Sequence, residues 1–380
     1  NRVTTNNHTH AFSWTRTGGM IDLGVLPGDT ESNARAINDN GWIVGNSWDS
    51  GSGIGHAFLW TPAGGMVDLG TLPGGNSSVA WAVSNSGQIV GSAGVPGDPA
   101  SPYTSTYGTL HGFSWTLAGG MVDIGSFGGE YWSQASQALA VNENGQVTGH
   151  ARLPNGDYHA FIWSQSTPMT DLQTLGGPYS YAAAINDSGQ VVGQSQINDP
   201  PNYSFRAYSW TPIGGMVNVG TGRSYDVSED GTVFGSAPAF KWTAAGGKVV
   251  LPSPPGGTSE RSVYAANDAG TAAVGYFALN NGNEHAFLWS QADGSIDLGT
   301  LGGKSSFAAD VNDSIQVAGS AQVPGGAAHA VLWEAQAAFG YRTGIAMALH
   351  MPEGRHFFLG VDRDRALPDD AQELQRLVAD

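Results

Sequence analysis

Cysteine is absent from the 380 residues of this chain, so disulfide bonds and thiol catalysis are excluded. Positive charge is scarce as well, because 15 Lys and Arg stand against 32 Asp and Glu, a formal net charge of −17. A chain this acidic lacks the basic surface that holds DNA or RNA, and anionic membranes repel it. No apolar run approaches the roughly 20 residues that a membrane span needs. We therefore expect neither a nucleic-acid nor a membrane partner.

Repetition is what the sequence has in plenty. The phrase HAFLWTPAGGMVDLGTLPGG, residues 56–75, returns in close variants from His111 and from His285. Each copy is marked by an aromatic-x-Trp motif, which ends at Trp14, Trp60, Trp115, Trp163, Trp210, Trp242, Trp289 and Trp333. The intervals between these tryptophans are 46, 55, 48, 47, 32, 47 and 44 residues, so eight anchors bound seven repeats. A period in the forties with several short strands is typical of a β-propeller blade.

Each repeat contains four predicted strands. In residues 56–92 the segments AFLW, MVDLG, VAWAV and QIVGS alternate in character and are separated by Gly-rich turns. Turns such as 38–41 and 186–189 carry Asn, Asp and Gly, which favours tight hairpins over calcium loops. The repeated Trp and His are expected to pack or cap the strands. The sequence thus predicts an all-β fold, a seven-bladed β-propeller of four-stranded antiparallel blades over residues 1–336, with a short α/β-like tail at 337–380.

The repeated motifs also resemble a known family. HAFLWT, IDLGTLGG and INDSGQVVG are similar to the repeats of the HAF-repeat family of bacterial extracellular proteins, over about residues 8–333. This resemblance implies an exported propeller, located outside the cell or in the periplasm of a bacterium. It supplies no catalytic residues.

The C-terminal segment 337–380 differs in texture from the repeats. It includes FGYRTGIAMALHMPEGRHFFLG and resembles part of the autoinducer-binding domain of LuxR-type regulators. Ala371, Leu374, Leu377 and Val378 would share one face of a helix. Only a fragment of that domain is present, so we expect the segment to dock on the propeller or to be mobile.

The two ends of the repeat array compete for one blade. There are eight HAF-type strands but only seven sets of inner strands. We expect the N-terminal segment around residues 10–14 to complete the blade built from residues 305–320.

Departures from the repeat are the best guide to function, because ligands bind to variable loops that rigid blades hold in place. The second-last position of the innermost strand is Ala in five repeats but Asp226 and Asp310 in two. A carboxylate at a packed position needs a hydrogen bond, an ionic partner or a cation. These two residues, with Glu130, are therefore the catalytic candidates. The alternative is a structural Asp that meets backbone amides or an Arg such as Arg223.

Further candidates lie in the loops at one end of the blades. The proposed substrate-binding residues are Tyr131, Trp132, Tyr179, Tyr181, Arg223 and Arg261. The proposed metal ligands are Asp226, Asp310, Asp29, Glu31 and Glu260. The aromatic residues suit an apolar or ring-shaped ligand, or else they pack their own loops. The acidic loop residues converge on a cation, or else they are solvated surface.

Motifs of nucleophilic and zinc catalysis are missing, since there is no G-x-S-x-G and no H-E-x-x-H. If the protein is an enzyme, carboxylates and a hard cation are therefore its expected catalytic groups. Ca²⁺ is such a cation, and it prefers oxygen ligands. One hypothesis is a monomeric Ca²⁺-dependent hydrolase that opens the lactone ring of N-acyl homoserine lactones, which would quench quorum sensing; the LuxR-like tail favours this substrate. The other is a non-catalytic extracellular module that binds glycans or proteins.

Overall fold

The computed structural model describes residues 2–3, 8–96, 109–129, 135–335, 344–350 and 356–362. Within them the chain is all-β, and the fold is the predicted seven-bladed β-propeller of antiparallel sheets. These ranges contain no helix, and hence none with the length and hydropathy that crossing a bilayer requires. The chain forms two compact units, Asn1–Ser224 (unit 1) and Tyr225–Asp380 (unit 2).

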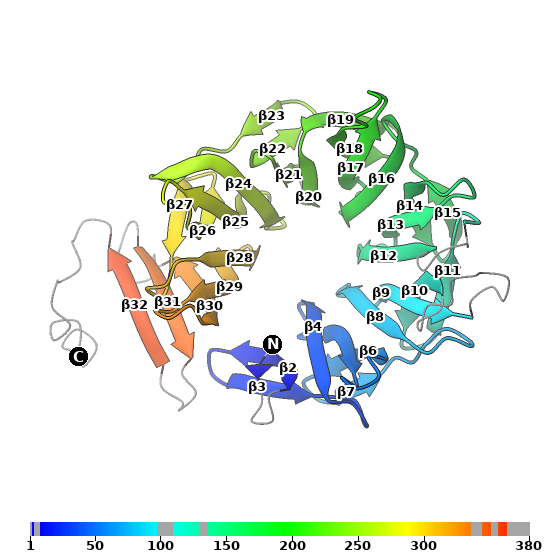
Figure 1. Ribbon diagram of the computed structural model, residues 1–380, viewed down its shortest axis with the longest axis horizontal. Helices are drawn as coiled ribbons and strands as arrows, with labels where there is room; N and C mark the ends of the chain where they lie inside the picture. The colour runs from blue at the N-terminus through cyan, green and yellow to red at the C-terminus, as the bar shows by residue number, and fades with distance from the viewer. Residues whose placement is uncertain are drawn as a thin grey trace. The chain divides into compact units, whose positions relative to one another are not determined.

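Unit 1 contains four four-stranded sheets, each a meander in chain order. They are β4 (Glu31–Ile37), β5 (Ile43–Trp48), β6 (Gly55–Thr61) and β7 (Gly65–Asp68); β8 (Ser78–Val83), β9 (Ile89–Val95), β10 (Thr109–Thr116) and β11 (Gly120–Gly125); β12 (Ser136–Val141), β13 (Val147–Arg152), β14 (Tyr158–Ser164) and β15 (Thr167–Asp171); and β16 (Gly176–Ile185), β17 (Val191–Ile197), β18 (Phe205–Thr211) and β19 (Gly215–Thr221). A three-stranded sheet of β1 (Arg2–Val3), β2 (Thr9–Thr15) and β3 (Gly19–Gly24) precedes them. The first strands β4, β8 and β12 lie side by side along one edge of this unit (Figure 1).

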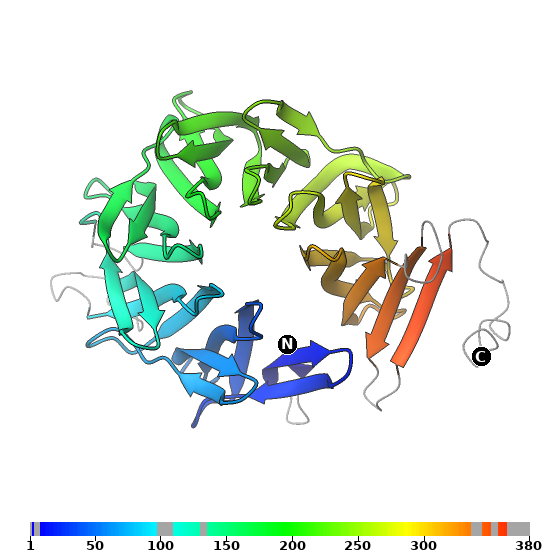
Figure 2. The ribbon, with the colours of Figure 1, turned by 180° about the vertical axis from the view of Figure 1, so that it is seen from behind.

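Unit 2 continues the same plan with three sheets, the first beginning at the division between the units. They are β20 (Arg223–Val227), β21 (Val233–Ser236), β22 (Phe240–Thr243) and β23 (Gly247–Val250); β24 (Gly257–Ala266), β25 (Ala272–Leu279), β26 (Glu284–Ser290) and β27 (Gly294–Gly299); and β28 (Ser306–Val311), β29 (Gln316–Gln322), β30 (Ala328–Ala335), β31 (Gly344–His350) and β32 (His356–Asp362). The rear view shows β31 and β32 at the outer edge of the last sheet (Figure 2).

The hydrophobic core lies between neighbouring sheets. Phe113 on β10 is fully buried, and it packs in one cluster with Val44 and Leu59 of the preceding sheet. Phe161 and Phe287, its counterparts in other repeats, are also fully buried. Each such ring contributes about 2 kcal/mol relative to an exposed one. Three of the repeated tryptophans, Trp115, Trp289 and Trp333, are buried in this core as predicted, and Trp60, Trp163 and Trp210 are partly buried and pack against it.

A β-bulge recurs at one place in the first strand. In six blades the register between the first and second strands shifts, and one residue of the first strand has no paired residue on the second. These residues are Arg35, Trp81, Leu139, Ala183, Tyr264 and Ala309. The glycine of the QVVG motif lies on the second strand next to this bulge, where the backbone of the first strand leaves no room for a side chain. A Cβ on Gly149 of β13 would collide with the backbone carbonyl of Gln137, and the same holds for Gly193 against Tyr181. Bulges twist a strand and redirect its side chains.

The repeated phrase connects consecutive blades through a buried serine. The hydroxyl of Ser78 on β8 accepts the N–H of Ala57 at 2.8 Å and donates to the carbonyl of Gly70 at 2.5 Å, both in the preceding sheet. The same pair of hydrogen bonds is made by Ser32, Ser136, Ser180 and Ser306. Repetition of the sequence therefore encodes repetition of the junction between blades.

In five sheets the histidine of the phrase pairs with the aspartate twelve residues later. His111 Nδ1 donates to Asp123 at 2.9 Å, and Asp123 in turn accepts the N–H of Gly125 at 2.7 Å. Equivalent pairs form at His10–Asp22, His56–Asp68, His159–Asp171 and His285–Asp297. These histidines join the third strand to the fourth, as expected of a structural role.

The prediction about blade completion is wrong. β29 pairs with β30, which contains His329 and Trp333, whereas β2 pairs with β1 and β3. The physical reason is that β29 and β30 are joined by a short hairpin, so their pairing closes a far smaller loop than pairing with the N-terminus. The backbone of 344–350 and 356–362 extends this sheet as β31 and β32. The helix predicted around 371–378 lies outside the described residues.

Candidate functional site

Asp226 and Asp310 take equivalent places on the first strands β20 and β28. The two carboxylate oxygens of Asp226 accept N–H groups from Val227 and, on β24, from Ala266, both at 2.8 Å. Asp310 accepts the N–H of Val311 at 2.8 Å. Backbone amides thus satisfy these carboxylates in part, as the structural alternative supposed, and Asp226 joins two adjacent first strands.

The surroundings of Asp226 favour its protonated form. Asp226 is half-buried, and loss of water around the carboxylate raises its pKa to about 7, against the two backbone hydrogen bonds. The negative charges of Asp310 and Asp268 raise this pKa further. The pKa of Asp310 is also raised, mainly by loss of water around its carboxylate and less by the charge of Asp268, against the hydrogen bond from Val311. A carboxylate with a pKa near neutrality can take up and release a proton at physiological pH.

A row of aromatic rings runs over the same strands of unit 2. Tyr225 contacts Tyr264 at a centroid distance of 5.7 Å, Tyr264 contacts Tyr276 at 5.7 Å, and Tyr276 contacts Phe307 at 5.6 Å. Tyr264 is 41% exposed and Phe307 is 37% exposed, so the row offers apolar surface to a ligand. The sequence analysis missed this row. A partial signal was the bulge position, which holds Tyr264 in this blade but Leu139, Ala183 and Ala309 in three others.

Two of the predicted site residues are committed to structural contacts. Glu31 accepts hydrogen bonds from the side chain and the N–H of Thr9 and from His8, which lower its pKa to about 2. Arg261 donates to Ser253 Oγ and to the carbonyl of Leu251, both at 2.6 Å, and so fixes the segment before β24. Both side chains therefore hold local structure, which the sequence could not reveal because their partners are distant or backbone atoms.

Of the remaining predicted charged residues, the structure fully describes Asp29 and Arg223. Asp29 lies in the turn between β3 and β4, and Arg223 is exposed at the start of β20. Glu130, Tyr131 and Trp132 lie outside the described residues, as does the side chain of Glu260.

Tyr179 and Tyr181 belong to an aromatic cluster of unit 1. Tyr181 stacks between Tyr179 and Tyr158, at centroid distances of 6.4 and 6.2 Å, and His150 meets it edge-on at 5.0 Å. Burial lowers the pKa of His150 to about 4, so its ring is neutral at pH 7. The two predicted tyrosines are thus brought together.

The predicted calcium site can be tested against the residues present. Across the described part of the chain, no three His, Asp or Glu side chains are grouped so that they could hold a metal ion. Both oxygens of Asp226 already accept backbone hydrogen bonds. A Ca²⁺ ion needs six to eight oxygen ligands, so these carboxylates as they stand do not fit it.

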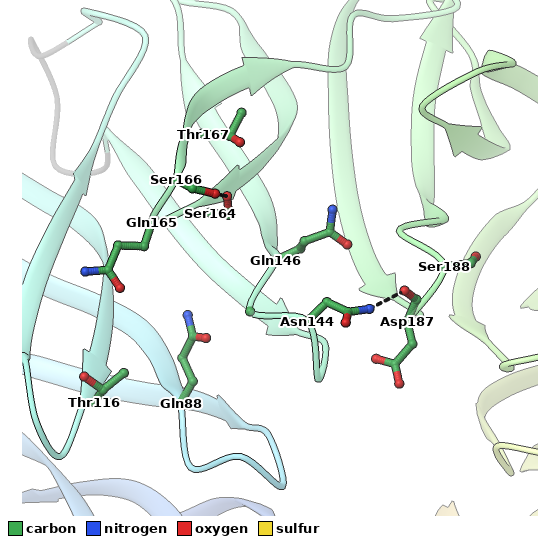
Figure 3. Close-up of a pocket in the computed structure, with 11 residues that line it drawn as sticks. Gln88, Thr116, Asn144, Gln146, Ser164, Gln165, Ser166, Thr167, Asp187 and Ser188 are labelled. Carbon is green, nitrogen blue, oxygen red and sulfur yellow. Dashed lines mark hydrogen bonds between the residues drawn. The ribbon is translucent and has the colours of Figure 1, made fainter.

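A polar pocket of about 810 Å³ lies in unit 1. Its lining residues are Gln88, Thr116, Asn144, Gly145, Gln146, Ser164, Gln165, Ser166, Thr167, Asp187 and Ser188 (Figure 3). They come from the turns β8–β9, β12–β13, β14–β15 and β16–β17 and from the end of β10. In an antiparallel meander these turns lie at one end of the sheets. The pocket is therefore at the opposite end from the loops that the sequence analysis favoured.

No protein-family model matches the chain, and no curated protein matches it. Similar solved structures include a prolyl endopeptidase, 10% identical with a TM-score of 0.53, the match covering 85% of this chain and 50% of that one. A puromycin hydrolase is 14% identical with a TM-score of 0.46 over 96% of this chain and 63% of that one. The β-propeller domain of the Trilobed protease from Pyrococcus furiosus is 8% identical with a TM-score of 0.43, over 88% and 96%.

This chain spans 63% or less of the lengths of the puromycin hydrolase and the prolyl endopeptidase. At such identities the likeness concerns the fold alone.

Proposed function

We propose that this protein is a hydrolase that opens the lactone ring of N-acyl homoserine lactones and thereby quenches quorum sensing. The observation that carries the proposal is the Asp226 carboxylate, whose pKa of about 7 suits a general base at neutral pH. It lies on the same strand as Tyr225, at one end of an aromatic row with exposed rings. A proton-accepting group beside apolar surface matches a substrate that joins an ester to an acyl chain.

In the proposed reaction, ionised Asp226 takes a proton from a water molecule while the water oxygen bonds to the lactone carbonyl carbon. The ring C–O bond then breaks, and the departing alkoxide receives the proton from Asp226. The sum is one lactone plus one water giving one N-acyl homoserine. Asp310 acts through its charge, which raises the proton affinity of Asp226.

The aromatic row would receive the acyl chain. Tyr264 and Phe307 offer exposed rings, and burial of a short acyl chain against them contributes about 0.8 kcal/mol per methylene. The substrate is uncharged, so the net charge of −17 does not repel it. Calcium dependence remains part of this proposal, without assigned ligands and with no step that uses the ion.

The test follows intact and ring-opened N-acyl homoserine lactones by mass spectrometry. Asp226→Asn should lower kcat/KM by about 100-fold or more, because the base is removed. The control is Asp293→Asn, which changes an exposed carboxylate in the β26–β27 turn and should leave turnover unchanged. Unaltered turnover in Asp226→Asn would remove this residue from the site. No turnover by the pure wild-type protein would favour the alternative, a non-catalytic module for glycans or proteins.

A further inference from the structure

We propose that the polar pocket of unit 1 binds a neutral saccharide. This inference is independent of the hydrolase proposal, because the pocket shares no residue with the carboxylates of unit 2. Its volume of about 810 Å³ is within the range of small-molecule sites, about 300 to 1,000 Å³.

The lining chemistry selects the ligand class. Four carboxamides and five hydroxyl groups line the pocket, and each of them can both donate and accept hydrogen bonds. Sugar hydroxyls have the same double capacity, so they can pair with such a surface without leaving polar groups unsatisfied. Neither an aromatic ring nor a Lys, Arg or His is among the lining residues, and Asp187 is their one charged side chain. Anions and apolar ligands are therefore disfavoured.

Several of these side chains are held in place before a ligand arrives. Gln88 Nε2 donates to Ser114 Oγ at 2.9 Å, and Gln146 Oε1 accepts from Asn142 Nδ2 at 2.8 Å. Asn144 Nδ2 donates to the backbone carbonyl of Asp187 at 2.7 Å, which joins two adjacent turns (Figure 3). Three of the four carboxamides, those of Gln88, Asn144 and Gln146, are thus fixed through one polar atom each, and the other polar atom can contact a ligand. Fixing side chains in advance lowers the entropy that binding costs.

The pocket also lies where the repeat is broken. The turn between the third and fourth strands has the pattern T-x-x-G-G at 61–65, 116–120, 211–215 and 243–247. In the blade of β14 and β15 the same turn is Ser164-Gln165-Ser166-Thr167, and its register is shifted. This substitution replaces glycines by side chains that hydrogen-bond. The turn at 290–294 also departs from the pattern but keeps the last glycine, whereas the turn at 164–167 has neither glycine. A departure that places hydrogen-bonding side chains in a pocket is what a ligand site within a repeat array requires.

The test is isothermal titration of the full chain with five neutral probes, namely cellohexaose, laminarihexaose, xylohexaose, maltohexaose and chitohexaose. At least one should bind with a dissociation constant below about 1 mM. Gln88→Ala and Gln165→Ala should each weaken that binding by about tenfold, since each removes hydrogen bonds to the sugar. Hexagalacturonate, which is polyanionic, should not bind, because Asp187 repels its carboxylates and no Lys, Arg or His lines the pocket to pair with them.

Gln291→Ala is the matched control, because Gln291 holds the place of Gln165 in the β26–β27 turn of unit 2 and is exposed. This variant should bind as the wild type does, and all three variants should keep the wild-type melting temperature and lactone turnover. Failure of all five probes to bind, or binding that Gln88→Ala and Gln165→Ala leave unchanged, would overturn the proposal. Neither result bears on the hydrolase proposal, which is tested by turnover alone.

Discussion

The carboxylate of Asp226 accepts the backbone N–H of Ala266 at 2.8 Å, and this bond ties the first strands of two adjacent blades together. The same carboxylate has lost much of its water, and its pKa is raised from 3.8 to about 7. Asp226 therefore both joins two strands by a hydrogen bond and gains or loses a proton near neutral pH. Stability and activity should both depend on its charge, in opposite directions.

The stability of the fold should fall as Asp226 ionises. Below about pH 4 the folded and unfolded chains both hold the proton; between about pH 4 and pH 7 the unfolded chain releases it first, so the free energy of unfolding decreases. Between pH 5 and pH 8, the free energy of unfolding in urea should fall by about 2 to 4 kcal/mol more in the wild type than in Asp226→Asn. Comparing the two pH values cancels the constant cost of the lost acceptor. A difference independent of pH would contradict the raised pKa.

The junction between blades should depend on the buried serine. Ser78→Ala removes an acceptor from the buried N–H of Ala57 and a donor from the half-buried carbonyl of Gly70, and so leaves both backbone groups without this partner. We expect a loss of about 1 to 3 kcal/mol in the free energy of unfolding, measured with urea. Ser52→Ala, in an exposed loop, is the control and should change stability by less than about 0.5 kcal/mol. Equal effects would show that the serine junction is not a stabilising element.

The glycine that faces the bulge should not tolerate a side chain. Gly149→Ala places a methyl group against the backbone carbonyl of Gln137, so the two strands must separate. We expect a cost of more than about 3 kcal/mol or failure to fold. Gly120→Ala is the contrast, because that residue has a φ of 65° but open space around its Cβ position. It should cost about 1 kcal/mol, and a similar cost at both sites in thermal unfolding would argue against a steric role for Gly149.

Calcium dependence can be tested without knowing the ligands. Treatment with EDTA should lower lactone turnover, and Ca²⁺ should restore it, if the ion belongs to the working enzyme as proposed. Zn²⁺ should restore it less well, because the chain has no cysteine to supply the thiolate ligands that zinc favours. Full activity after dialysis against EDTA would remove calcium from the account and leave a reaction of carboxylates and water alone.

The repeated strands and turns could be predicted from the sequence, whereas contacts between residues far apart in the chain could not. Strands, turns and buried tryptophans were predictable, because hydrophobic alternation and Gly-rich turns act locally. The pairing of β29 with β30 was not, because two similar strands could compete for one place. The roles of Glu31 and Arg261 were also hidden, since their partners are set by the folded backbone. The aromatic row from Tyr225 to Phe307 assembles residues from three blades, so its contacts depend on how the folded strands lie side by side.

The most direct test of the central claim is the pH dependence of kcat/KM for lactone opening, with the spontaneous hydrolysis subtracted. A general base with a pKa of about 7 predicts that kcat/KM rises about tenfold per pH unit below pH 7 and levels off above it. In Asp226→Asn the residual rate should lose this rise. A wild-type profile that is flat between pH 5 and pH 8, or a rise that survives in Asp226→Asn, would contradict the assignment of Asp226 as the base.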